Sequence, residues 1–485
     1  MQTDPKVSCM STVTTLRSID SSLDFKTLRS RYRSGSLRPS QVVSHVLDRI
    51  EERGDDGVWT YVAPRADVLA RAAALEEVPP ETEALPLYGL PFSVKDCIDI
   101  ADVPTTCACP ELAYTARATN PVIQRVLAAG AIFIGKTNLD QFATGLVGVR
   151  TPYGVSRNPF DAAFIPGGSS SGAAVSVAAG LVSFGVGTDT GGSGRVPAAC
   201  GNIVGLKPTR GLLSTSHMVA ANRSLDCLSV FALTCSDAME VVAAGQAFDA
   251  TNPFSRAAKP VPVARRAFHG REFRFAVPSK GDREFFGNAD APKLFEEAIG
   301  VLTEMGGSCV EIDYAPFRKV NKLLFDGPWV AERMASLKKL GGPHRDPLRA
   351  LLPVTRQVMS AATRYTAVDA FEGLHELSRL RRQIEPLWSD VDVLVVPTIG
   401  TLYRISEVEA DPIDANKTMG HYTYFVNLLD LAAIAVPNGF QPNRLPLGVT
   451  FVGPAFTDLY LAGLGGEFHR RRCVKLGATP FDLPH

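Results

Sequence analysis

The chain has 485 residues, of which 50 are Lys or Arg and 50 are Asp or Glu, so its formal net charge is zero. This balance argues against a nucleic-acid-binding protein, which carries a basic patch or stripe. No apolar run reaches the ~18 residues that span a bilayer, and residues 1–20 lack the apolar core of a signal peptide. We therefore expect a folded protein with neither nucleic acid nor a membrane as partner.

The cysteines and histidines give no sign of a disulfide framework or a metal site. Nine cysteines are scattered along the chain, and the closest pair, Cys107 and Cys109, does not form a C-x-x-C motif. The eight histidines show no H-x-x-H spacing. This pattern favours a reduced, cytoplasmic protein without a metal ion or another cofactor.

Helical patterns and apolar strand-like runs alternate along the first 200 residues, and a further apolar run follows near residue 393. Apolar residues recur at helical spacing over residues 39–53, and Pro39 suits the first turn of that helix. Further helices are expected over 66–77, 121–129 and 171–180. Buried strands are expected within 87–100, 129–138, 180–192 and 391–400. Strands that are apolar throughout and alternate with helices predict an α/β fold with a mainly parallel sheet covered on both faces.

The domain organisation is predicted to be simple. Residues 1–22 are expected to form a flexible N-terminal tail, and residues 23–485 one domain. The stretch 249–285 is rich in Pro, Arg and Ala and resembles a linker. We interpret it as a connection within that domain, because the apolar strand near residue 393 needs a sheet to join.

Two glycine-framed serine clusters raise the question of function. They read "FIPGGSSSGAAVSVAAG" (164–180) and "GTDTGGSGRVPAACGN" (187–202). Ser193 follows two glycines just after a predicted strand, where the backbone N–H groups of residues 190–193 could converge on an oxyanion. The alternative is a turn that only ends the strand. A Ser-His-Asp triad would favour a G-x-S-x-G motif, which these clusters lack, although a distant histidine such as His217 stays open.

A lysine is the alternative base. Lys95 follows an apolar run and is expected at the carboxyl end of a buried strand, where α/β proteins bind ligands. Burial disfavours the ammonium form, so a lysine there can act as a base. The alternative is a structural lysine paired with the adjacent Asp96 or with another carboxylate at the surface.

Four motifs, taken together, resemble the amidase signature family of Ser-Ser-Lys hydrolases. They are "GLPFSVKD", "GKTNLDQFATG", "PGGSSSGAAVSVAAG" and "GTDTGGSGRVPAACGNIVGLKPTRG", and the resemblance covers about residues 23–460. It implies a single α/β/α domain around a large mixed sheet and an amide hydrolase that forms an acyl-enzyme. Lys95 matches the base, Ser169 the bridging serine held by a cis peptide, and Ser193 the nucleophile. The oxyanion hole then falls on Thr190, Gly191, Gly192 and Ser193.

The resemblance also assigns supporting residues. Asp189 and Arg195 match positions that pin the nucleophile loop, and we expect them to form a structural ion pair. Ser170 and Ser171 become hydrogen-bonding supports or the first turn of the helix that follows.

Within the family, the closest resemblance is to allophanate hydrolase. The stretch "GPWVAER" resembles a motif whose arginine grips the substrate carboxylate and which matches Arg333 here. A guanidinium fork suits a planar carboxylate. The alternative is a solvated arginine on a helix, beside Glu332. Two features depart from that pattern. Phe325 stands where the family has a substrate-binding tyrosine, and a separate C-terminal domain of many allophanate hydrolases is not expected here.

Three functions therefore remain open. The first is an amidase acting on a small amide of the allophanate type, with release of ammonia or an amine. The second is an amidase for another carboxylated or aromatic amide, selected by Phe325 and Arg333. The third is a partner-dependent amidotransferase subunit or a binding protein that has lost catalysis. A homodimer is also left open.

Overall fold

The computed structural model describes residues 20–80, 82–259, 267–270, 272–341 and 346–484. Most of the predicted N-terminal tail and part of the 249–285 stretch lie outside these residues. The strands are β1 (Trp59–Val62), β2 (Pro91–Lys95), β3 (Pro104–Thr105), β4 (Tyr114–Thr115), β5 (Ile132–Thr137), β6 (Phe184–Thr188), β7 (Val204–Lys207), β8 (Leu228–Ala232), β9 (Phe273–Pro278), β10 (Gly307–Ile312), β11 (Val393–Pro397), β12 (Leu431–Phe440) and β13 (Pro446–Pro454).

The helices are distributed along the whole chain. They are α1 (Phe25–Arg33), α2 (Pro39–Arg53), α3 (Arg65–Glu76), α4 (Pro121–Ala128), α5 (Ser171–Ala178), α6 (Val196–Cys200), α7 (Cys235–Gly245), α8 (Ala291–Glu304), α9 (Ala315–Phe325), α10 (Trp329–Gly341), α11 (Pro353–Ser360), α12 (Ala367–Ile384), α13 (Leu387–Asp390), α14 (Ile405–Ala410), α15 (Asp414–Met419), α16 (Phe425–Leu428) and α17 (Asp458–Arg472).

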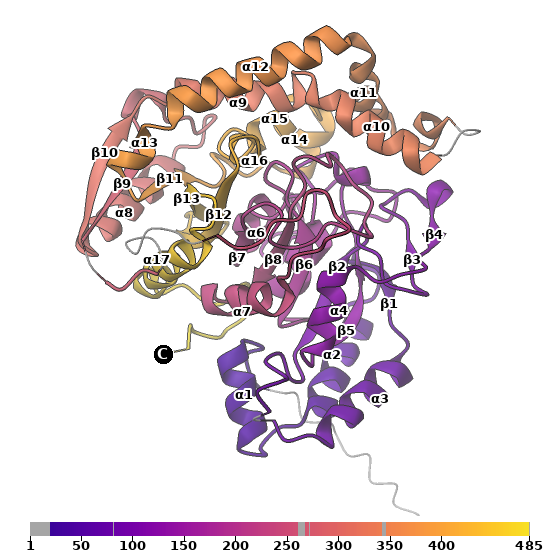
Figure 1. Ribbon diagram of the computed structural model, residues 1–485. Coiled ribbons are helices and arrows are strands. Elements are labelled where there is room, and N and C mark those ends of the chain that lie inside the picture. The colour runs from indigo at the N-terminus through magenta and orange to yellow at the C-terminus, as the bar shows by residue number, and fades with distance from the viewer. Residues whose placement is uncertain (1–19, 81, 260–266, 271, 342–345, 485) are drawn as a thin grey trace, which may run out of the picture.

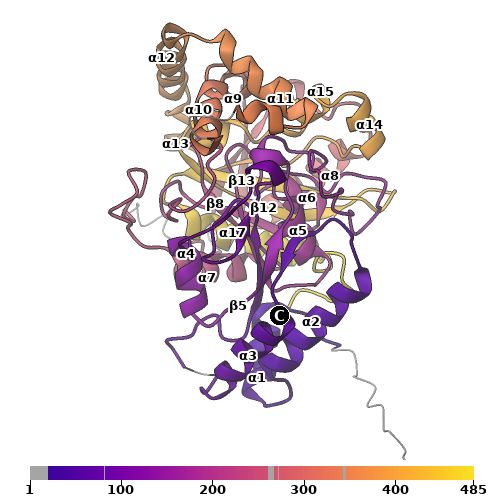
Figure 2. The ribbon, with the colours of Figure 1, turned by 90° about the vertical axis from the view of Figure 1, so that its right-hand side faces the viewer.

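Among the described residues, eleven strands form one mixed sheet in the order β1-β5-β2-β6-β8-β7-β12-β13-β11-β9-β10. Helices cover both faces: in Figure 2, α4 and α7 lie on one side of the sheet and α5 and α6 on the other. The predicted α/β/α architecture with a large mixed sheet is confirmed. Its parallel pairs form two blocks, β5-β2-β6 and β11-β9-β10, whereas β8, β7, β12 and β13 between them pair antiparallel.

The strands on either side of the linker-like stretch belong to this one sheet. The end of the stretch is more than a connection, because it contains β9 itself, and β11 pairs with both β9 and β13. The strand near residue 393 thus joins the sheet that the N-terminal half begins, as its apolar sequence requires.

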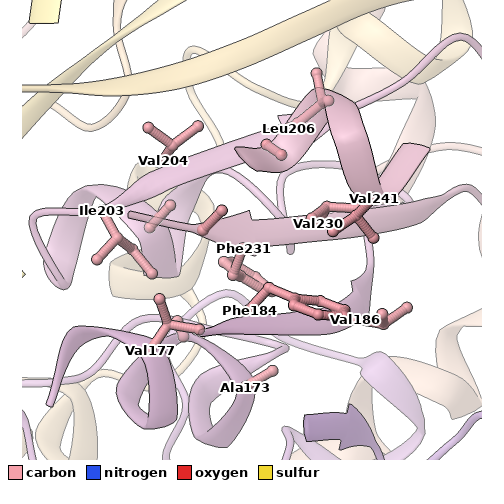
Figure 3. Close-up of a cluster of buried hydrophobic side chains, with 14 of the residues drawn as sticks. Ala173, Val177, Phe184, Val186, Ile203, Val204, Leu206, Val230, Phe231 and Val241 are labelled. Carbon is pink, nitrogen blue, oxygen red and sulfur yellow. The ribbon is translucent and has the colours of Figure 1, made fainter. Parts of the chain in front are cut away.

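The two faces of β2 make different contacts: one face packs against an aromatic ring of β6, and the other forms a hydrogen bond to α5. Phe92 stacks on Phe184 at 5.0 Å on one face. On the other face, Ser93 hydrogen bonds Ser176 of α5 at 2.9 Å. Because side chains alternate along a strand, Lys95 shares the face of Ser93 and points toward the α5 side. Figure 3 shows the buried apolar cluster in which α5, β6, β7, β8 and α7 meet.

The small residues of α5 let this helix approach the sheet closely. A side chain on Gly172 would meet the Val58 carbonyl oxygen at 2.4 Å and the Asn138 nitrogen at 2.8 Å. All eight residues of α5 are buried. The tiny side chains between the two serine clusters therefore position the clusters against the strand ends.

The layer of helices α9 to α12 lies beyond one end of the central strands (Figure 1). It contacts the loop after β5, because Arg333 of α10 donates to the Ala143 carbonyl at 3.0 Å. Since β2, β5 and β6 run parallel, their carboxyl ends meet at this edge of the sheet.

Candidate active site

A continuous chain of hydrogen bonds joins a lysine and two serines at that edge. Lys95 is the last residue of β2, Ser169 follows Gly168 through a cis peptide, and Ser193 lies after β6. Lys95 Nζ lies 2.8 Å from Ser169 Oγ, which lies 2.9 Å from Ser193 Oγ. Each hydroxyl can donate and accept, so a proton can pass along this chain in either direction.

The surroundings of Lys95 favour its neutral form. The side chain is completely buried, and this desolvation lowers the pKa of the ammonium group, although nearby Cys97, Cys107 and carboxyl groups offset part of the effect. The alternative that Lys95 pairs with the adjacent Asp96 is wrong, because Asp96 instead forms a buried ion pair with Lys136 at 3.1 Å. Lys95 Nζ makes its second hydrogen bond to Thr188 Oγ1 at 2.7 Å.

The two other serines of the first cluster support the backbone. Ser170 Oγ donates to the Thr188 carbonyl at 3.1 Å, and Ser171 begins α5. Both roles agree with the sequence interpretation. They leave Ser169 as the residue of this cluster that touches Lys95 and Ser193.

Asp189 and Arg195 fix the loop that carries Ser193. Arg195 Nε and Nη2 donate to the two carboxylate oxygens of Asp189 at 2.8 and 2.9 Å, and both side chains are fully buried. Burial alone would raise the pKa of Asp189, but the Arg195 guanidinium and the N–H donors around it outweigh this and hold that pKa below its usual value. The expected structural ion pair is present.

The Asp189 carboxylate also accepts a hydrogen bond from one of the N–H groups that were expected in the oxyanion hole. Gly192 N–H donates to Asp189 Oδ1 at 2.8 Å, and Gly194 N–H donates to Oδ2 at 3.1 Å. Gly192 has a φ of 136°, and a side chain there would meet Thr423 Oγ1 at 2.4 Å. Glycine is therefore required at this position for both its dihedral angle and its contact.

Three other N–H groups of the loop are free. Within the described part of the chain, the backbone N–H groups of Thr190, Gly191 and Ser193 have no acceptor, although all three residues are buried. Buried backbone donors are nearly always paired, so three free ones are available to a ligand oxygen atom. Of the four donors expected from the sequence, Gly192 N–H is occupied and these three are free.

Arg333 and Phe325 lie on the helices above this loop. Arg333 is 2% exposed, and its Nη1 donates to the Phe142 and Ala143 carbonyls and to Thr144 Oγ1 at 3.0–3.3 Å. Within the described structure, its Nε and Nη2 have no acceptor. Burial lowers the pKa of Arg333 to about 10, so the guanidinium stays charged at neutral pH.

The aromatic ring of Phe325 faces this guanidinium. Arg333 Cζ lies 5.2 Å from the Phe325 ring centroid, and the centroid of the Tyr424 ring also lies 5.2 Å from that of Phe325. Leu324 and Tyr424 in turn pack on Gly191, where an added side chain would meet them at 2.6 and 3.0 Å. The structure thus brings the predicted pair Phe325 and Arg333 together near the free N–H groups.

A histidine-based triad finds no support in the geometry. Among the described residues, the hydrogen-bond partner of Ser193 Oγ is Ser169. His217 is exposed, and its backbone carbonyl accepts from Asp99 N–H at 3.0 Å.

Sequence reasoning missed Thr188, Thr144 and Asp226. Thr188 ends β6 and binds Lys95, whereas Thr144 lies in the motif GKTNLDQFATG, whose spacing alone indicates no role for it. Asp226 accepts from Thr190 Oγ1 at 2.6 Å, and burial raises its pKa to about 6. It lies 33 residues after Ser193 along the chain, and no spacing signal in the sequence links the two.

Metal-binding clusters and membrane-spanning helices are absent from the described residues. No group of three or more His, Cys, Asp or Glu side chains there could hold a metal ion. No helix in the same residues is long and apolar enough to cross a membrane. The eight cysteines within the described ranges are free thiols.

Comparison with known families identifies the class of protein. The family model described as Amidase matches residues 41–461, so the chain belongs to the amidase family. The urea amidolyase of Lachancea kluyveri is 40% identical over 416 residues, which cover 86% of this chain and 22% of that protein. The chain thus spans about a fifth of the length of this curated relative.

Two further relatives are similar over more of their own length. The solved structure of Kluyveromyces lactis allophanate hydrolase superposes with a TM-score of 0.83 at 36% identity, covering 91% of this chain and 72% of that one. A glutamyl-tRNA(Gln) amidotransferase subunit from Symbiobacterium thermophilum is 33% identical over 478 residues, which cover 91% of this chain and 95% of the relative. The predicted family, with its similarity to allophanate hydrolases, is confirmed.

Proposed function

We propose that the protein hydrolyses a small amide through an acyl-enzyme on Ser193, with Lys95 as the base and Ser169 as the proton shuttle. The observation that carries this proposal is the unbroken hydrogen-bond chain from Lys95 Nζ through Ser169 Oγ to Ser193 Oγ. A nucleophile within hydrogen-bond reach of its base is the arrangement that covalent catalysis needs.

The acylation step follows from this chain. Neutral Lys95 accepts the Ser169 proton while Ser169 accepts the proton of Ser193. Ser193 Oγ then forms a bond to the amide carbon, and the carbonyl oxygen becomes an oxyanion. When the C–N bond breaks, the proton returns through Ser169 to the leaving nitrogen, which departs as ammonia or an amine.

Deacylation uses the same groups. A water molecule gives its proton through Ser169 to Lys95 and attacks the acyl carbon. Breaking the bond to Ser193 Oγ returns this proton to Ser193 and releases the acid. One lysine therefore serves both halves of the reaction.

We infer that the oxyanion is bound by the N–H groups of Thr190, Gly191 and Ser193. These donors are free and are held by a loop that the buried Asp189–Arg195 pair fixes. Donors that are oriented before the reaction stabilise the developing charge without reorganisation.

We further propose that the substrate is a carboxylated amide of the allophanate type. The free Nε and Nη2 of buried, charged Arg333 can take a planar carboxylate with two hydrogen bonds. Similarity to a urea amidolyase and an allophanate hydrolase supports this substrate. Phe325, in place of a tyrosine, points to an amide that needs no hydrogen bond at that position.

The direct test is ammonia release by the purified chain from allophanate, malonamate, biuret, and simple aliphatic and aromatic amides. The proposal predicts turnover of the two carboxylated amides with a higher kcat/KM than that of neutral amides of similar size. Turnover of neutral amides alone would reject the carboxylate assignment and leave the amidase chemistry in place.

A second candidate function is that of an amidotransferase component that needs a partner. The similarity to a glutamyl-tRNA(Gln) amidotransferase subunit over nearly all of that protein favours it. The mass of the protein in solution and the activity of the isolated chain distinguish the two. A chain that turns over small amides alone needs no partner protein.

We also propose that residues 23–485 form one amidase domain in the cytoplasm. The family match over residues 41–461 and the single large sheet support the domain. The free thiols of the described cysteines support a reducing compartment.

A further inference from the structure

A cavity of about 340 Å³ lies beside the catalytic residues and plays no part in the chemistry described above. Its walls include Tyr114, His217, Arg223, Asp226, Ser336 and Lys339. Lys95, Ser169 and Ser193 do not line it. Two features connect the cavity with the residues proposed to act in catalysis and substrate binding: the Asp226 carboxylate and helix α10.

Asp226 connects the cavity wall with the oxyanion loop. Its side chain lines the cavity and accepts a hydrogen bond from Thr190 Oγ1 at 2.6 Å. Thr190 supplies one of the three free N–H groups. One residue of the cavity wall therefore contacts a residue of the proposed oxyanion site.

Helix α10 connects the cavity to Arg333. Arg333, Ser336 and Leu340 follow one another at spacings of three and four residues, so they lie along one face of the helix. Ser336 and Leu340 line the cavity, whereas Arg333 reaches the loop after β5. The same face thus runs from the cavity wall to the guanidinium that we assign to the substrate.

Three polar side chains of the cavity wall, Arg223, Ser336 and Lys339, have no hydrogen-bond or ion-pair partner in the described part of the chain. Ser336 Oγ is buried without a hydrogen-bond partner. Arg223 and Lys339 are exposed, and neither forms an ion pair with a carboxylate of the described residues; the Arg223 guanidinium lies over the Phe254 ring, 6.0 Å from its centroid. Asp226 is the one carboxylate among the described lining residues, and it is already bound by Thr190 and by the backbone N–H groups of Ala221 and Asn222.

We propose that this cavity is the route by which a carboxylated amide reaches Ser193, and that Arg223 and Lys339 attract and bind its carboxylate before Arg333 does. The inference rests on the proposed function, since it concerns the substrate of the same site. Unpaired cations at the mouth of a polar cavity raise the local concentration of an anion and its association rate.

The charge part of the proposal is tested with a matched pair of variants. Lys339→Gln removes a cavity charge, and Lys338→Gln removes an exposed charge from the neighbouring position that does not line the cavity. At low salt, Lys339→Gln and Arg223→Gln should each lower kcat/KM for malonamate by roughly tenfold, with kcat unchanged and the neutral amide unaffected. High salt should remove the difference, because it screens exposed charges. An equal loss in Lys338→Gln, or no loss in either cavity variant, would overturn this part.

The route itself is tested without a substrate. Ser336→Trp places a large ring in the cavity and should slow the labelling of Ser193 by a small uncharged fluorophosphonate at least tenfold, whereas Ser336→Ala should label at the wild-type rate. Thermal melting identifies any loss of fold. Wild-type labelling by a folded Ser336→Trp protein would show that the cavity is not the entrance. If Ser193 is labelled but no carboxylated amide is hydrolysed, the proposed substrate is rejected. The labelling rate of Ser336→Trp still tells whether the cavity is the entrance.

Discussion

Lys95 Nζ hydrogen bonds Thr188 Oγ1 at 2.7 Å, and the two residues end neighbouring parallel strands of the sheet. This contact gives Lys95 a second fixed partner besides Ser169, and so sets the direction of its amino group. Val94 pairs with Val186 just before the two strands end, and this register places Lys95 beside Thr188. The register between β2 and β6 therefore sets the direction of the Lys95 side chain.

Thr188→Val should lower kcat by about tenfold, since it keeps the shape of the side chain but removes one hydrogen bond of roughly 1 kcal/mol or more. It should also shift the pH dependence to lower pH, because the hydroxyl accepts from the ammonium and stabilises that form. Steady-state kinetics across pH tests both effects. Thr188→Ser retains the hydroxyl and serves as the control. A pH profile in Thr188→Val identical to that of the wild type would contradict the role of this contact.

Asp189→Asn should cost about 3–5 kcal/mol of unfolding free energy, because it leaves the buried Arg195 guanidinium without its counter-charge. Activity should fall as well, since the same carboxylate holds the Gly192 and Gly194 N–H groups. Urea denaturation measures the stability. The exposed pair Arg379–Glu376 provides the comparison, and Glu376→Gln should change stability by less than about 1 kcal/mol. Similar losses in both variants would contradict the account of the loop.

Arg333→Ala should raise KM strongly for carboxylated amides and hardly affect neutral ones. Phe325→Tyr should improve allophanate turnover roughly tenfold if the added hydroxyl finds one well-placed hydrogen bond. Kinetics with a carboxylated and a neutral amide measure both. Equal losses on the two substrates in Arg333→Ala would mean that Arg333 only anchors α10 to the Phe142–Thr144 loop.

A buried carboxyl far from the site makes stability depend on pH. Burial, with a smaller contribution from Asp24, raises the pKa of Asp237 to about 8. The folded chain therefore keeps this proton between the ordinary carboxyl pKa and about 8, whereas the unfolded chain releases it. The free energy of unfolding should fall as pH rises through this window. Asp237→Asn should weaken that dependence in denaturation curves, and an unchanged slope would contradict the assignment.

The sequence predicted the elements whose residues repeat in a simple pattern. The helix expected over 39–53 is α2 (Pro39–Arg53), and the strands expected near residues 95, 137 and 188 are β2, β5 and β6. Lys95, Ser169 and Ser193 were assigned by the resemblance, and the structure places them within hydrogen-bond distance of one another.

The contacts that the sequence could not reveal depend on tertiary structure. The antiparallel strands β12 and β13 in the second half of the sheet were not predicted, although both are almost wholly buried. The binding of Gly192 N–H by Asp189 follows from the path of a single loop, which residue types alone do not specify. Asp226 reaches Thr190 only because the chain returns through β8 beside β6.

In the proposed mechanism, Lys95 activates Ser193 through Ser169. This activation can be measured as the rate at which a fluorophosphonate labels the protein across pH, with the modified residue identified by mass spectrometry. We expect a single adduct on Ser193. Its rate should rise with pH through a lysine pKa lowered by burial, since only the neutral amine accepts a proton. Lys95→Ala should lose this rate by several orders of magnitude, and Lys95→Arg should not restore it, because a guanidinium stays protonated. Labelling of Ser170 or Ser171, or a Lys95→Ala protein that labels at the wild-type rate, would contradict this mechanism.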